Sequence, residues 1–112
     1  MHELTIARNI IDIVSAEADR NGAGSVSEVC LEIGLLAGIE YDSLSFAMET
    51  LTQGTVLSGA SIVVEKPSGC AKCDRCSNEF PFDNFMGSCT KCGSTDLSVI
   101  RGMELRVKTI TI

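Results

Sequence analysis

The sequence predicts an α+β fold in which two helices pack on a three-stranded sheet, with a small four-cysteine module inserted before the last strand. Two segments repeat apolar residues every three or four positions, and three others alternate apolar with polar residues. Five of the six cysteines fall in one short stretch, after which the alternation returns. The last strand is too long and regular for a small module, so we expect it to rejoin the sheet. Residues 68–101 are then an insertion between residues 1–67 and residues 102–112.

Both helices are predicted from their apolar periodicity and their ends. The first is expected over residues 4–20 and ends at Asn21-Gly22-Ala23-Gly24. The second should begin after Asp42 or Ser43, because either side chain accepts hydrogen bonds from the unpaired amides of a first turn. Gly54 is placed to cap its end. The apolar faces are Leu4, Ala7, Ile11, Val14 and Ala18 in the first helix, and Leu44, Ala47, Met48 and Leu51 in the second.

Three strands follow from alternation. The first starts from Ser25, with Val29, Leu31, Ile33 and Leu35 on its buried face and Glu28, Cys30 and Glu32 on the other. Residues 60–66 form the second strand, which Pro67-Ser68-Gly69 ends. In the last strand Met103, Leu105 and Val107 alternate with Glu104, Arg106 and Lys108. The parity slips before Ile110 and Ile112, which predicts a β-bulge or the end of an edge strand.

Composition excludes two classes of partner. The 112 residues carry a formal net charge of −6 with only nine basic side chains. Nucleic-acid binding depends largely on Lys and Arg, so no nucleic-acid partner is expected. Charged residues interrupt the first 20 positions, and no apolar run has the length of a membrane span. We therefore expect a cytoplasmic protein with no membrane contact.

The cysteine spacing predicts a zinc ribbon. Cys73-x2-Cys76 and Cys89-x2-Cys92 are separated by twelve residues, which is typical of a structural site where four thiolates form a closed tetrahedron around Zn(II). Gly93 follows the second pair, where a tight turn needs permissive backbone angles. We expect the fold of this module to depend on the metal. The aromatic residues that would shield it are Phe80, Phe82 and Phe85.

Two cysteines stand outside this pattern. We place Cys70 outside the zinc tetrahedron because it follows the linker Pro67-Ser68-Gly69, although an alternate ligand or an oxidation-prone exposed thiol stays open. Cys30 lies on the first strand and is interpreted as a small half-buried residue. A redox dithiol and an iron–sulfur cluster are the competing interpretations of the cysteine-rich segment.

The single histidine is His2. Its imidazole and its own amide nitrogen can close a six-membered chelate ring, and the Met1 amine can close a five-membered ring on the other side of that amide. Square-planar nitrogen coordination suits Ni(II) or Cu(II), whereas Zn(II) prefers tetrahedral sites. The alternative is an ordinary exposed residue at a frayed terminus.

Met1-His2-Glu3, the strand end Leu31-Glu32-Ile33-Gly34 and the two cysteine pairs together resemble the HypA family of hydrogenase and urease nickel-incorporation proteins, over essentially the whole chain. The resemblance implies a nickel metallochaperone that carries Ni(II) as transient cargo and works with the GTPase HypB. The recipient would be the large subunit of NiFe-hydrogenase, and in some organisms urease with its accessory proteins.

The resemblance also assigns metal ligands. His2 would be the central nickel ligand, and backbone nitrogens of Met1, His2 and Glu3 would complete the set, while the zinc stays structural. Residues 1–67 and 102–112 would then be the nickel-binding domain and residues 68–101 the zinc-binding domain. Some family members place further histidines in or near the zinc module, and this chain has none. We therefore expect a weaker and more labile nickel site.

A zinc-ribbon protein-interaction module without a nickel role is the main alternative. Enzyme catalysis is not expected, because no second histidine can pair with a nucleophile and a four-cysteine zinc has no open position for water. Exposed strand edges and linkers at Pro67-Ser68-Gly69 and Arg101-Gly102 leave both a monomer and a domain-swapped homodimer open.

Overall fold

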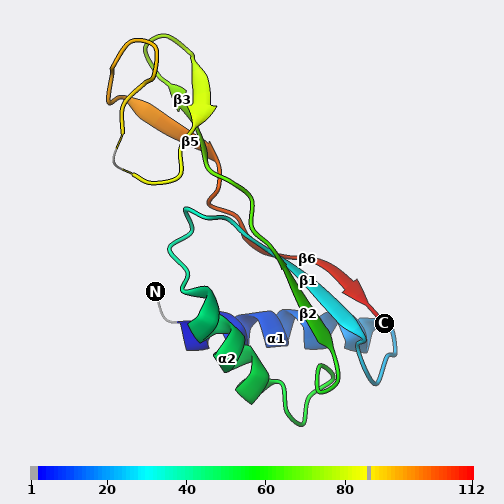
Figure 1. Cartoon of the computed structure of the whole chain (residues 1–112). Helices are drawn as coiled ribbons and strands as arrows, with labels where there is room; N and C mark the ends of the chain where they lie inside the picture. The colour runs from blue at the N-terminus through cyan, green and yellow to red at the C-terminus, as the bar shows by residue number, and fades with distance from the viewer. Residues whose placement is uncertain (1–2, 86) are drawn as a thin grey trace.

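The chain forms an elongated molecule of 54 × 25 × 17 Å with two three-stranded sheets, one beyond the other along the long axis (Figure 1). This computed structural model describes residues 3–85 and 87–112. The larger body holds two helices and one three-stranded sheet, and the smaller body holds the other three-stranded sheet. The predicted α+β fold with an inserted cysteine-bearing module is confirmed.

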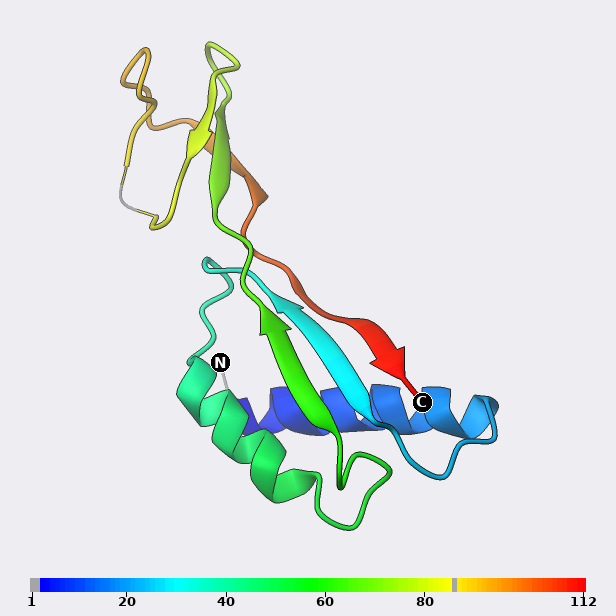
Figure 2. The same ribbon diagram turned by 45° about the vertical axis from the view of Figure 1, so that its right-hand side comes forward.

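Helices α1 (Glu3–Arg20) and α2 (Tyr41–Leu51) pack against one another and the sheet (Figure 2). The buried face of α1 is formed by Ile6, Ala7, Ile10, Ile11, Val14 and Ala18, whereas Leu4, which the periodicity placed there, is exposed. The N-cap of α2 is Glu40, whose carboxylate accepts a hydrogen bond from the Asp42 amide. The predicted N-caps Asp42 and Ser43 are therefore wrong, because the observed N-cap lies two residues before Asp42 and three before Ser43.

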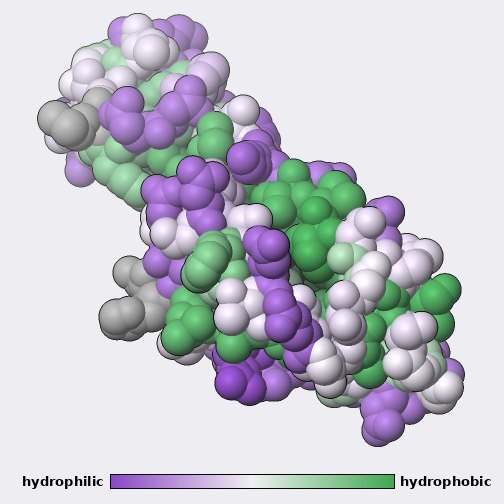
Figure 3. All heavy atoms as spheres, turned by 60° about the horizontal axis from the view of Figure 1, so that its bottom comes forward, coloured by the Kyte–Doolittle hydropathy of each residue, from purple (hydrophilic) through white to green (hydrophobic). Residues whose placement is uncertain are grey.

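The helical side of the molecule also keeps some apolar surface. Leu4 and Ile13 on α1 and Phe46 on α2 are exposed. Figure 3 shows apolar areas interspersed with polar residues on this side. No helix within residues 3–85 and 87–112 has both the length and the apolar character needed to cross a membrane.

Strand β1 (Glu28–Ile33) lies at the centre of the larger sheet. It pairs in parallel with β2 (Ser61–Glu65) and antiparallel with β6 (Leu105–Thr111). Val29, Leu31 and Ile33 are buried in the core as predicted, while Leu35 lies beyond the strand and is exposed. The predicted bulge is confirmed: Cys30 pairs with Thr109 and Leu31 with Val107, so Lys108 is the extra residue.

The smaller sheet consists of β3 (Cys70–Cys73), β4 (Glu79–Pro81) and β5 (Leu97–Arg101). Its small core contains Ala71, Cys73, Phe80, Phe82 and Cys89. The rings of Phe80 and Phe82 meet edge to face with centroids 6.2 Å apart. Phe85 meets the Phe82 ring in the same way but is itself exposed, so two of the three predicted aromatic residues shield the module.

Three backbone segments meet where the two bodies join, and we call residues 34–36, 67–69 and 102–104 the waist. The Gly34 amide donates to the carbonyl oxygen of Glu104 at 2.8 Å, and the Leu36 amide donates to that of Gly102 at 2.7 Å. The side chain of Leu36 is buried in the core of the smaller body, although Leu36 follows a strand of the larger one. The waist is therefore packed and hydrogen-bonded.

Candidate metal centres

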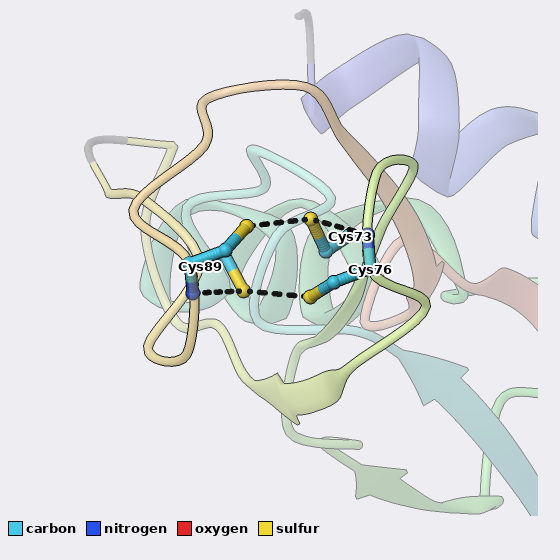
Figure 4. Close-up of side chains that lie close together, drawn as sticks. Cys73, Cys76 and Cys89 are labelled. Carbon is cyan, nitrogen blue, oxygen red and sulfur yellow. Dashed lines mark hydrogen bonds between the residues drawn. The ribbon is translucent and has the colours of Figure 1, made fainter.

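Four cysteine side chains converge at the end of the smaller sheet. Cys73 ends β3 and Cys76 lies on the turn after it, while Cys89 and Cys92 lie on the turn between β4 and β5. Their Sγ atoms all lie within 4.8 Å of one another, and Figure 4 shows the side chains of Cys73, Cys76 and Cys89 pointing toward one another. The Sγ–Sγ distances are 3.6 Å from Cys73 to Cys92 and 3.5 Å from Cys76 to Cys89.

Both cysteine turns have the same backbone form. The Ser77 amide donates to the Cys73 carbonyl at 2.9 Å, and the Gly93 amide donates to the Cys89 carbonyl at 3.0 Å. Both residues have positive φ, 64° at Ser77 and 76° at Gly93. The glycine was expected from the sequence, whereas Ser77 was missed. Its position directly after Cys76 repeats that of Gly93 after Cys92, which is the signal that could have found it.

The sulfur arrangement fits a zinc ion. Four thiolates at Zn–S bonds of about 2.3 Å occupy the corners of a tetrahedron whose edges are ~3.8 Å long. The two measured Sγ–Sγ distances of 3.6 and 3.5 Å lie close to that edge. Four soft ligands in a closed tetrahedron are the donor set of structural zinc. The four-cysteine cluster therefore suggests a metal site.

Backbone amides favour the thiolate form of two of the sulfurs. The Cys76 amide donates to the Cys73 sulfur at 3.4 Å and lowers the pKa of that thiol. The Cys92 and Lys91 amides donate to the Cys89 sulfur, each at 3.4 Å, and lower its pKa to about 6. For Cys76, the Asn78 amide acts to lower the pKa, but desolvation and the neighbouring sulfurs outweigh it and raise the pKa to about 12. A divalent cation would supply the charge that lets all four ionise together.

The other two cysteines lie outside this cluster. Cys70 is buried at the start of β3. The alternative of an exposed, oxidation-prone thiol at this position is therefore wrong. Cys30 is also buried, whereas the sequence predicted a half-buried residue there. An ion pair of 2.7 Å joins Glu65 on β2 to Lys108 on β6, and it crosses the central strand that carries Cys30. Lys108 lowers the pKa of Glu65, and Cys30 contributes a smaller effect.

The predicted nickel ligands Met1 and His2 lie outside the described residues. Glu3 is described, and it begins α1. Its carboxylate Oε2 accepts a hydrogen bond of 3.3 Å from the amide of Glu40, the N-cap of α2. Figure 1 shows the start of α1 beside the loop that leads into α2. The Glu3 side chain thus ties the beginnings of the two helices together.

Comparisons with known proteins agree over the full chain. The family model described as "Hydrogenase/urease nickel incorporation, metallochaperone, hypA" matches residues 1–112. The hydrogenase maturation factor HypA of Parabacteroides distasonis is 41% identical, with 100% of this chain and 97% of that protein covered. The HypA of Chlorobaculum tepidum is 37% identical, with 100% of this chain and 99% of that protein covered.

A solved structure has the same fold. The solution structure of the Ni metallochaperone HypA from Helicobacter pylori matches with a TM-score of 0.73 and 24% identity, covering 100% of this chain and 97% of that one. At that identity the likeness is evidence of fold alone. The family model and the curated relatives carry the assignment: this chain belongs to the HypA family of nickel metallochaperones for hydrogenase and urease maturation, which are maturation factors and not enzymes.

Proposed function

We propose that this chain binds Ni(II) through residues 1–3 and, with the GTPase HypB, passes it to the large subunit of NiFe-hydrogenase. The same chain would supply Ni(II) for urease by passing it to the urease accessory proteins. The observation that carries this proposal is that the chain's single imidazole stands at position 2, in a member of a nickel-incorporation family. We place the activity in the cytoplasm, where thiols stay reduced, because all six cysteines are free of disulfides.

Nickel coordination at this site uses nitrogen. The His2 imidazole, the His2 amide and the Met1 amine can occupy three corners of a square plane, and the Glu3 amide is a candidate for the fourth. A side-chain role for Glu3 is less favoured, since its carboxylate already accepts the hydrogen bond from the Glu40 amide. A site built mostly from backbone nitrogens is expected to hold Ni(II) weakly, which suits release of the cargo.

A separate Zn(II) holds residues 68–101 together in this proposal. Its ligands are Cys73, Cys76, Cys89 and Cys92, and the near-tetrahedral sulfur distances support that assignment. Residues 1–67 and 102–112 form the nickel-binding domain. The closed zinc site keeps its metal while nickel is exchanged at the other, because it offers no open coordination position.

Calorimetric nickel titration of the untagged protein tests the nickel site. His2→Ala should abolish nickel binding and leave the zinc content and the circular dichroism spectrum unchanged. Leu4→Ala, at an exposed side chain two positions further on, is the matched control and should bind nickel like the natural chain. Unchanged nickel affinity in His2→Ala would support the zinc-ribbon interaction module without a nickel role.

A second comparison separates the two roles of Glu3. Glu3→Gln removes the carboxylate charge but keeps an oxygen that can accept the hydrogen bond from Glu40. If the Glu3 backbone nitrogen is the ligand, X-ray absorption should find the same nitrogen ligands in this variant. Loss of an oxygen ligand in the variant would instead assign the carboxylate to the nickel.

A further inference from the structure

A groove of about 630 Å³ lies between α2 and the edge strand β2. Its floor is part of the core, formed by Leu31, Leu44, Met48 and Leu57. Ala60, Ile62 and Val64 form the strand wall, since alternate residues of a strand share one face. The opposite wall is polar and comes from α2, and it includes Asp42, Ser45, Glu49 and Gln53 from α2 and the turn after it.

The outer edge of β2 offers unpaired backbone groups along this groove. β2 has one strand neighbour, β1, within the described part of the chain. The Ser61 amide donates to Ser27 at 2.9 Å, so Ser61, Val63 and Glu65 turn their amides and carbonyls toward β1 in the parallel ladder. Ile62 and Val64 therefore turn theirs outward. An edge of this kind is a template for another strand.

We propose that this groove receives an extended segment of a partner protein, which adds to the outer edge of β2 as a fourth strand and directs basic side chains toward α2. The outward backbone groups of Ile62 and Val64 specify an extended main chain. The side chains of the same two residues are only partly buried, and they offer an apolar wall to alternate residues of the incoming strand.

Charge complementarity indicates which side chains the incoming strand turns toward α2. Both charged side chains that α2 turns to the groove, Asp42 and Glu49, are acidic, and this helix contains no Lys or Arg. The one basic residue of the lining, Lys66, lies at the end of the strand with its ammonium 4.2 Å from the centroid of the Tyr41 ring. An incoming segment with Lys or Arg between its apolar residues would therefore meet opposite charge along the helix wall.

The chain's own C-terminal strand does not compete for this site. β6 lies on the far side of β1, and its antiparallel pairing with β1 occupies its inner edge. The described residues that line the groove include neither Glu3 nor any cysteine. Binding there is consequently measurable without nickel, and its outcome is independent of the nickel site.

NMR titration of the full-length zinc-loaded protein, without nickel, tests the proposal. The probe is a capped six-residue peptide of alternating Lys and Val. We expect saturable amide shifts confined to residues 61–66 and to the groove side of residues 42–53. The same peptide with its strand-pairing amides N-methylated, and a peptide of alternating Glu and Val, should produce no saturable shifts there.

Two matched variants locate the charge contribution. Glu49→Lys places repulsion on the groove wall and should raise the Kd of the Lys–Val peptide about fivefold. Glu79→Lys makes the same charge change at an exposed position of the smaller body and should leave the Kd unchanged. Ile62→Pro removes one outward amide but no bond to β1, and should weaken binding while the remaining spectrum is retained.

Several results would overturn the proposal. Equal binding of the N-methylated peptide, or equal effects of Glu49→Lys and Glu79→Lys, would reduce the binding to general charge attraction. Shifts on the opposite face of the sheet would place the peptide elsewhere. Shifts at β2 that depend on protein concentration without peptide would make a second copy of this chain the occupant. If Ile62→Pro disturbs the fold, the spectrum of this variant shows the change. The two charge variants and the N-methylated peptide then test the proposal without it.

Discussion

Gly34 and Gly102 face each other across the waist without room for a side chain between them. A Cβ atom at Gly34 would lie 2.0 Å from the carbonyl oxygen of Gly102. Gly102 also has a φ of +110°, which L side chains rarely adopt. The obstructing atoms belong to the backbone, so a small side-chain rearrangement cannot make room. The two bodies are thus joined by close backbone packing at the segments that the sequence indicated as linkers.

Gly34→Ala should destabilise the protein by about 1–3 kcal/mol, the usual cost of forcing extra atoms into a packed site. Chemical denaturation followed by circular dichroism measures the effect. Gly59→Ala is the matched control, because nothing lies within 4 Å of a Cβ there and its φ is not positive. Equal unfolding free energies for the two variants would contradict the close packing at the waist.

Leu36→Ala should destabilise the smaller body although residue 36 follows a strand of the larger one. Leu36 is 5% exposed and packs in the smaller core with Phe80 and Phe82. Replacing a buried leucine by alanine costs roughly 2–5 kcal/mol of stability. Hydrogen exchange of residues 70–73 and 97–101 reports the loss. Leu35→Ala removes the same atoms from a side chain that is 45% exposed and should cost far less; similar protection in both variants argues against the role of Leu36.

The zinc-loaded protein should contain almost no rapidly reacting thiols. Four sulfurs are expected to be bound to the metal, and Cys30 and Cys70 are buried. A chelator should release one zinc per chain and expose the four cluster thiols to a colorimetric thiol reagent, with loss of ordered structure in residues 68–101. Rapid reaction of all six cysteines before chelation would contradict the structural-zinc assignment.

The Glu65–Lys108 ion pair should contribute to stability in a defined pH window. Lys108 lowers the pKa of Glu65 from 4.5, so this contribution is present above about that pH and is lost as the pH falls through the lowered value. Glu65 raises the pKa of Lys108 from 10.5, so the contribution is also lost as the pH rises through that raised value. In a double-mutant cycle of Glu65→Gln and Lys108→Met, the coupling energy should be present at pH 7 and vanish at low pH. A coupling energy that does not change with pH would mean that the coupling arises from packing and not from the ion pair.

Local patterns in the sequence predicted much of the fold. The apolar periodicity located α1 and α2, and the slip in alternation before Ile110 predicted the bulge at Lys108. The two cysteine pairs predicted the cluster, because a two-residue gap is itself enough to turn both sulfurs toward one point. In each case the determining residues are neighbours in the sequence.

The missed features depend on contacts between distant segments. Leu35 and Leu36 are equally apolar, and only the position of the smaller body decides that Leu36 is buried and Leu35 exposed. Glu40 was not recognised as the N-cap of α2, since glutamate is not among the residues that commonly take that place. The contact between Glu3 and Glu40 joins two helices across 37 positions, and no local pattern encodes it.

The position of β1 between β2 and β6 also determines when the larger sheet can be completed. During synthesis β2 becomes available before β6, and residues 66–104 separate the two. Closing that long segment costs chain entropy, which a module already folded on its metal reduces by holding residues 69 and 102 near each other. Metal loading at the four cysteines would thereby accelerate assembly of a sheet that contains none of them.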